Sequence, residues 1–156
     1  MHRILLVLLS ILLVAASPKR PVIVSVVATP QLEIVPGEKK EYLLELKITK
    51  GYHIQSNPAS EKYLIPVTAT LEETSGIAIG APIYPPGIPF RLKGSQTDIS
   101  TYEGTVRIKI PIKVNSDAKP GEMALKGTLR YQGCDAILCF PPVKLPFEVK
   151  LKIIKK

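Results

Sequence analysis

Two cysteines, Cys134 and Cys139, are the residues of this sequence whose type and spacing best suit chemistry. Four residues separate them. If strands flank this stretch as a hairpin, opposite Cα atoms lie about 4.5–5.5 Å apart. A disulfide needs about 4.4–6.8 Å between the same atoms. The spacing therefore permits a bridge between Cys134 and Cys139.

Such a bridge would close a very short loop. The chain-entropy relation gives about 2 kcal/mol for that loop, against almost 5 kcal/mol for a 100-residue loop. A chain of 156 residues can also bury a core without a staple. The short loop mildly favours a bridge that opens and closes, but structural bridges in hairpins exist as well. Both interpretations stay open on the residues alone.

Pro141 and Pro142 follow the second cysteine closely. Two prolines remove two backbone donors and force an extended course. The chain there cannot complete a ladder of hydrogen bonds, so we expect Cys139 near a sheet edge and open to a partner. Thiol–disulfide exchange needs that access.

Alternating apolar and polar residues predict the strands that must hold the cysteines. The clearest alternation covers Val106–Val114, Met123–Tyr131 and Phe147–Ile153. Further candidate strands, separated by Pro/Gly turns, are Val22–Ala28, Glu41–Thr49, Ile65–Leu71 and Gly76–Ile83. This number and spacing of strands predicts an all-β fold, an immunoglobulin-like antiparallel β-sandwich. The longest segment without a clear pattern is Tyr84–Glu103.

The composition narrows the possible functions. A length of 156 residues suits one domain and excludes a TIM barrel, and 15 prolines argue against long helices. The 21 Lys and Arg against 13 Asp and Glu give a net charge of +8. Many of these basic residues fall on the outer phase of the strands, and aromatic residues do not alternate with them. We therefore expect no nucleic-acid binding.

The first residues are typical of a secretory signal peptide. A short basic start precedes an apolar run from Ile4 to Ala16. We expect residues 1–16 to be this signal and residues 17–156 to form one exported domain, periplasmic or otherwise extracytoplasmic. Lys19 and Arg20 follow the run, which leaves an uncleaved N-terminal anchor as the alternative.

Other side chains offer weaker sites. His53 with the two cysteines gives at most three ligands, whereas a closed zinc site needs four, so we expect no metal. A Cys–His nucleophile lacks an orienting third residue. Phosphate-binding glycine loops and dinucleotide fingerprints are absent from the sequence, so no cofactor is expected. The remaining aromatic candidates are interpreted as core or rim residues: Tyr42, Tyr52, Tyr63 and Tyr131.

The cysteine stretch carries a family resemblance. It reads Tyr131-Gln132-Gly133-Cys134, then Cys139-Phe140-Pro141-Pro142. Supporting segments, in order along the chain, are Gly51-Tyr52-His53-Ile54, Leu64-Ile65-Pro66, Tyr84-Pro85-Pro86-Gly87 and Tyr102-Glu103-Gly104. In these segments the sequence resembles the N-terminal periplasmic domain of the thiol:disulfide interchange protein DsbD and related stand-alone disulfide-corrector domains.

The resemblance implies a function. It implies an immunoglobulin-like domain that acts as a thiol-disulfide oxidoreductase through a cysteine pair. By the family's pattern, Cys139 forms the mixed disulfide with partners and Cys134 resolves it. The implied partners are a thioredoxin-like donor, periplasmic clients such as isomerases or cytochrome-maturation thioredoxins, and a membrane electron-carrier protein.

The resemblance also implies a cap over the cysteine pair. The matching region is the Pro89–Ser95 part of the long unpatterned segment, where Phe90 is the candidate cap residue. Tyr131, Phe140 and Pro141 are the candidates for the surroundings of the pair. The alternative from a different class is a non-enzymatic binding or adaptor β-sandwich with a structural hairpin disulfide.

Overall fold

The computed structural model describes residues 21–155, and within them it contains strands and no helix. The elements are β1 (Val24–Val26), β2 (Leu32–Ile34), β3 (Lys39–Ile48), β4 (His53–Gln55), β5 (Thr68–Leu71), β6 (Ile77–Ile79), β7 (Ile88–Phe90), β8 (Ile99–Tyr102), β9 (Thr105–Val114), β10 (Gly121–Tyr131), β11 (Gly133–Cys134) and β12 (Val143–Ile153). The predicted all-β fold is confirmed.

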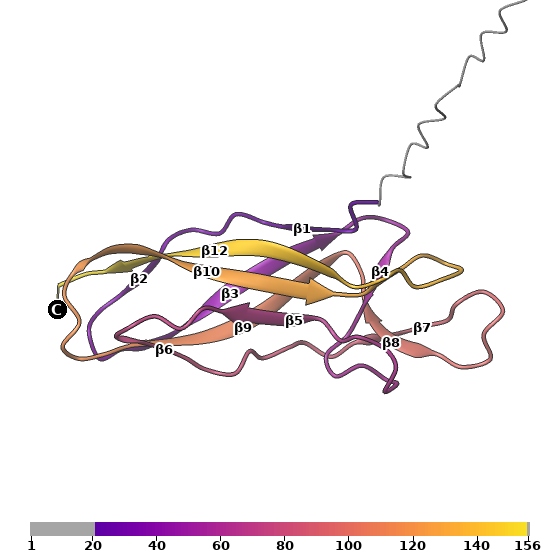
Figure 1. Ribbon diagram of the computed structural model, residues 1–156, viewed down its shortest axis with the longest axis horizontal. Coiled ribbons are helices and arrows are strands. Elements are labelled where there is room, and N and C mark those ends of the chain that lie inside the picture. The colour runs from indigo at the N-terminus through magenta and orange to yellow at the C-terminus, as the bar shows by residue number, and fades with distance from the viewer. Residues whose placement is uncertain (1–20, 156) are drawn as a thin grey trace, which may run out of the picture.

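Two four-stranded sheets form the body of the domain (Figure 1). One has the order β1-β3-β9-β6 and the other β2-β12-β10-β5. All pairs in them are antiparallel except β2 with β12. Buried residues of both sheets form one cluster, which includes Leu44, Ile108, Leu125 and Val149. The two sheets therefore pack face to face as a sandwich.

The predicted alternation decides which side chains reach the core. In β9 the residues Val106, Ile108, Ile110, Ile112 and Val114 are all buried. The strand's charged residues lie on the outer face, where the Arg107 guanidinium pairs with Glu45 at 2.8 Å. Met123 is an exception: it keeps the apolar phase of β10 but is 38% exposed, because it lies close to the end of the strand. Most of the positively charged side chains thus lie on the solvent-facing surface of the sheets.

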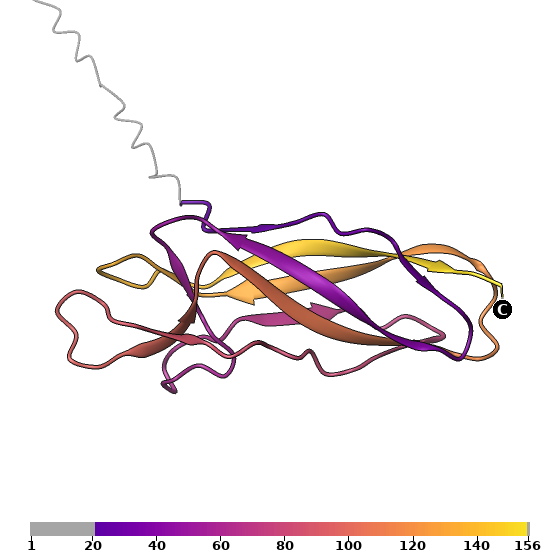
Figure 2. The same ribbon diagram turned by 180° about the vertical axis from the view of Figure 1, so that it is seen from behind.

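A third sheet, with the order β11-β4-β8-β7, lies at the end of the sandwich opposite the C-terminus (Figures 1 and 2). Its strands have two to four residues each. The segment Tyr84–Glu103, which has no clear sequence pattern, contributes β7 and β8 to this sheet. This segment is therefore partly β-structure held by cross-strand pairing. The sequence does not show these strands, because three or four residues are too few for a recognisable alternation of apolar and polar residues.

The long hairpin of β10 and β12 carries the cysteine stretch. These strands pair from Gly121↔Ile153 to Tyr131↔Val143, so the chain between them emerges at the third sheet. No helix in the described part of the chain is long and apolar enough to cross a membrane. The predicted signal peptide, residues 1–16, lies outside the described residues.

Candidate functional site

Cys134 and Cys139 are joined by a disulfide. They lie opposite each other in an antiparallel bridge, between hydrogen bonds from Phe140 N to Gly133 O (2.7 Å) and from Asp135 N to the Leu138 carbonyl (3.0 Å). Two residues paired in this position make no backbone hydrogen bond to each other. Their Cα atoms lie closer together than those of a hydrogen-bonded pair. The Cα atoms of Cys134 and Cys139 are 3.9 Å apart, closer than the range expected from the sequence.

The two sulfur-bearing residues differ in exposure. Cys134 lies in β11 and is 0% exposed, whereas Cys139 is half-buried. Pro141 and Pro142 are exposed and follow Cys139 without joining a ladder. Cys139 is therefore the more exposed of the two residues, while Cys134 is shielded. The expectation that partners attack Cys139 stays a prediction.

Gln55 contacts both sulfurs from the neighbouring strand. It lies in β4, is 0% exposed, and its Nε2 is 3.2 Å from Cys134 Sγ and 3.6 Å from Cys139 Sγ. Its Oε1 is buried and has no hydrogen-bond partner among the described residues. A buried acceptor left in this state costs about 1–3 kcal/mol. Gln55 was missed by the sequence analysis, although it directly follows the Gly51–Ile54 segment that supports the family resemblance.

His53 connects the cysteines to the candidate cap residue. It pairs with Cys134 in the register of β4 and β11. Its Nε2 lies 3.0 Å from Glu103 Oε2, and its ring stacks on Phe90 with centroids 3.6 Å apart. Phe90 therefore reaches the neighbourhood of Cys134 through the imidazole of His53.

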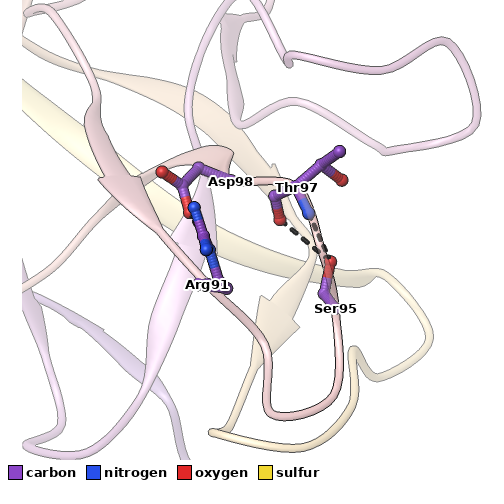
Figure 3. Close-up of polar contacts among 4 residues, drawn as sticks. All are labelled: Arg91, Ser95, Thr97 and Asp98. Carbon is purple, nitrogen blue, oxygen red and sulfur yellow. Dashed lines mark hydrogen bonds and ion pairs between the residues drawn. The ribbon is translucent and has the colours of Figure 1, made fainter.

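The connection between β7 and β8 rests against the cysteine loop. Lys93 N donates a hydrogen bond to the Ala136 carbonyl at 2.7 Å. Within this connection Arg91 Nε bonds Asp98 Oδ1 at 2.6 Å, and Ser95 Oγ both donates to Thr97 O and accepts from Thr97 N (Figure 3). The Arg91 guanidinium lowers the pKa of the Asp98 carboxyl. The segment thus has its own internal bonds and one anchor on the cysteine loop.

Asp135 organises the turn between the two cysteines. Its Oδ1 accepts hydrogen bonds from the backbone N–H groups of Ile137 (2.7 Å) and Leu138 (2.8 Å). The same two bonds, with that of Leu138 the stronger influence, hold the pKa of the Asp135 carboxyl below its usual value. The carboxylate is therefore used within the turn, and the apolar side chains of Ile137 and Leu138 remain exposed at its tip.

The other predicted surrounding residues take different places. Phe140 packs against Tyr52, with ring centroids 6.3 Å apart, and Phe140 and Pro141 line a small apolar recess together with Pro21 and Ile23. Tyr131 is only 4% exposed and belongs to the core cluster, where burial raises the pKa of its hydroxyl. Phe140 and Pro141 thus lie next to Cys139, whereas Tyr131, the last residue of β10, packs in the core beneath the hairpin of β10 and β12.

The site offers no constellation for metal. Residues 21–155 contain no group of three or more His, Cys, Asp and Glu side chains placed to hold an ion. The sulfurs of Cys134 and Cys139 are bonded to each other, and His53 is engaged with Glu103. The Cys134–Cys139 disulfide is a bond that can open and close by thiol–disulfide exchange.

One comparison with known proteins identifies a family. A family model described as "Thiol:disulfide interchange protein DsbD, N-terminal" matches residues 21–151. No curated protein sequence matches the chain.

Among solved structures, the N-terminal periplasmic domain of ScsB from Proteus mirabilis has a TM-score of 0.50 at 14% identity and shares the fold. The match covers 83% of this chain and 44% of that chain, so this chain spans less than half of the solved ScsB domain. The reduced DsbD N-terminal domain of Neisseria meningitidis has a TM-score of 0.45 at 18% identity, with 72% and 81% covered. A complex between the DsbD N-terminal and PilB N-terminal domains of Neisseria meningitidis has a TM-score of 0.45 at 19% identity, with 68% and 71% covered.

Proposed function

Because this chain belongs to the family of the N-terminal domain of the thiol:disulfide interchange protein DsbD, which takes part in thiol–disulfide exchange, we propose that it is an extracytoplasmic protein-disulfide reductase relay. Residues 17–156 form the exported domain, behind a signal peptide or anchor in residues 1–16. The domain accepts electrons from a reduced thioredoxin-like protein, which a membrane electron carrier keeps reduced. It passes these electrons to disulfide-bearing periplasmic clients.

The exchange begins at Cys139. A donor thiolate attacks Cys139 Sγ, the bond between Cys139 and Cys134 breaks, and its electron pair stays on Cys134 as a thiolate. The donor's second thiolate then attacks the mixed disulfide, so the donor leaves oxidised. Cys134 and Cys139, with two protons taken up, remain as a dithiol. Two electrons have been transferred.

The second half reaction is the reverse at a client. Cys139 thiolate attacks the client disulfide and forms a mixed disulfide, while the first client sulfur leaves as a thiolate. Cys134 thiolate then attacks Cys139, which restores the internal bridge and releases the reduced client. Phe90 and its connection to β8 shield the pair between the two encounters, since Phe90 covers His53 beside Cys134.

One observation carries this proposal. The disulfide joins a fully buried sulfur-bearing residue, Cys134, to a half-buried one, Cys139, across a very short loop. A short loop gives a staple little entropic benefit, about 2 kcal/mol. One reachable sulfur is what an exchange reaction needs, because the attacking thiolate must reach one sulfur of the pair.

Trapping tests the proposal directly. The probe is a thioredoxin whose resolving cysteine has been replaced and whose attacking cysteine has been activated as a mixed disulfide with thionitrobenzoate. In the Cys134→Ser protein, the Cys139 thiolate should attack the thioredoxin sulfur, displace thionitrobenzoate as the leaving thiolate and form a stable mixed disulfide. The matched Cys139→Ser protein should form none, because Cys134 is buried. Equal trapping by the two variants, or trapping by neither, contradicts the assigned roles.

The reduction potential separates this function from its alternative, a binding or adaptor sandwich with a structural disulfide. Known disulfide exchangers have potentials between about −120 and −270 mV, whereas structural bridges lie below about −300 mV. We expect the Cys134–Cys139 pair to equilibrate with glutathione or thioredoxin in the range of about −180 to −270 mV. A value below about −300 mV would favour the structural role.

A further inference from the structure

We propose that Gln55 is a catalytic residue of the exchange, because its side-chain amide donates a hydrogen bond to the Cys134 sulfur as the bridge opens. The inference rests on the proposed function and adds to it the group that receives the leaving thiolate. Gln55 lies 79 positions from Cys134 in the sequence, on the three-residue strand β4.

The geometry defines which end of the amide faces the sulfurs. A disulfide carries no hydrogen, so its sulfurs can only accept. The group of Gln55 that lies 3.2 Å from Cys134 Sγ and 3.6 Å from Cys139 Sγ is therefore the –NH₂ donor. The backbone of Gln55 is held from two sides, since its N–H donates to the Gln132 carbonyl and its carbonyl accepts from Val67 N.

The chemistry places negative charge at this contact. When a thiolate attacks Cys139 Sγ, the electrons of the broken bond move to Cys134 Sγ, which leaves as a thiolate. Cys134 is 0% exposed, so water does not solvate the developing charge. In the described chain, Gln55 is the hydrogen-bond donor that contacts either sulfur. A hydrogen bond to a charged acceptor is stronger than one to a neutral acceptor, so this contact strengthens as the bond breaks.

The free oxygen of Gln55 supports a role in both redox states. Gln55 Oε1 is buried and has no hydrogen-bond partner within residues 21–155, so it can accept a hydrogen bond. A half-turn of the amide would present Oε1 to the S–H of a neutral Cys134 thiol. One side chain can thus donate to the disulfide or thiolate and accept from the thiol. The titratable groups around the pair are His53 on β4, Glu103 beyond β8 and Asp135 in the cysteine loop.

A substitution that removes the side-chain amide tests the inference. Gln55→Met keeps the length of the side chain and loses the amide. The matched control is Thr101→Val, because Thr101 is also buried and lies opposite Gln55 in the register of β4 and β8, and its hydroxyl bonds the Ile88 carbonyl and neither sulfur. The rate of bridge opening by dithiothreitol is measured for both variants and the unchanged protein, and circular dichroism and the thermal midpoint confirm that each is folded.

We expect Gln55→Met to slow the opening by about tenfold, in line with the loss of a hydrogen bond to a developing charge. Thr101→Val should stay within about twofold of the unchanged protein. A second measurement uses proteins that also carry Cys139→Ala, in which the pKa of the Cys134 thiol is read from thiolate absorbance. The pKa should rise by about one to two pH units when Gln55→Met is added.

The outcomes distinguish this inference from the proposed function. If the unchanged protein exchanges readily and Gln55→Met does so at the same rate, the role of Gln55 is refuted and the relay stands. Equal slowing by Gln55→Met and Thr101→Val means that loosened packing is the cause, which also refutes it. If dithiothreitol and thioredoxin both fail to open the bridge in the unchanged protein, the relay and the role of Gln55 fall together.

Discussion

Opening the bridge should leave the domain folded. Cys134 and Cys139 are five positions apart, so the loop that the bridge closes gives about 2 kcal/mol by the chain-entropy relation. At roughly 2.1 cal/mol/K of unfolding entropy per residue, the loss corresponds to a thermal midpoint lower by about 7 °C. A relay that spends part of each cycle as a dithiol needs its fold to survive this loss.

The same free energy must appear in the redox equilibrium. If the bridge stabilises the folded state by about 2 kcal/mol, folding must stabilise the bridge by the same amount. At about 30 mV per 1.4 kcal/mol, the folded protein should have a potential about 45 mV below that of its own unfolded chain. The two measurements are independent, so they close a thermodynamic cycle.

Urea unfolding measures the first quantity on the oxidised protein and on the Cys134→Ala, Cys139→Ala double variant. Equilibration with glutathione, with and without denaturant, measures the second. A loss of more than about 5 kcal/mol, or a double variant that is unfolded, would refute the reasoning, since the bridge would then be a structural staple. Two values that agree with each other but lie well away from about 2 kcal/mol would show that loop entropy does not account for the coupling.

Three further predictions concern the cap, the turn and the core. Phe90→Ala removes the ring that stacks on His53, so the bridge should be opened severalfold faster by dithiothreitol. Asp135 has a lowered pKa, so its two loop bonds are charge-assisted at neutral pH and weaken as the pH falls through the folded-state value, below 3.8. Asp135→Ala should therefore speed hydrogen exchange of the two bonded loop amides by a larger factor at pH 6 than at pH 2. Gly127→Ala places a Cβ 2.5 Å from Phe147 Cζ and should destabilise the domain by about 1–3 kcal/mol in urea.

Each of these has a control in the same element. Ile88→Ala changes an exposed residue of β7 and should leave the opening rate unchanged. Asp135→Asn keeps an acceptor oxygen, so its loop amides should remain more protected than those of Asp135→Ala. Gly121→Ala adds a Cβ in open space on β10 and should cost less than about 0.5 kcal/mol. A control that behaves like its test variant contradicts the stated cause.

The long strands could be predicted because their residues alternate over many positions. Val106–Val114 and Phe147–Ile153 appear in the structure as β9 and β12 with the expected faces buried. The cysteine pair could be predicted because a short spacing between two strands of one hairpin brings the residues together. Both inferences depend on interactions that are local in the sequence.

The strands of the third sheet could not be predicted in the same way. β4, β7, β8 and β11 have two to four residues each, so no period can be recognised in them. Their pairing joins segments far apart in the sequence, as β4 does with β11. Gln55 was missed for this reason, because it is 79 positions from Cys134 in the sequence and no local pattern indicates that the two side chains meet.

The positions of Pro21 and of the carboxyl end determine at which end of the chain a tag or surface linker can be joined without blocking the disulfide. Pro21 lies in the recess beside Phe140 and Pro141, whereas the chain ends at the opposite tip of the sandwich (Figure 1). A carrier, affinity tag or surface linker joined ahead of Pro21 would stand next to the reactive bridge and obstruct large partners. The same attachment at the carboxyl end would leave the bridge facing outward, which is the orientation to use for immobilised exchange assays.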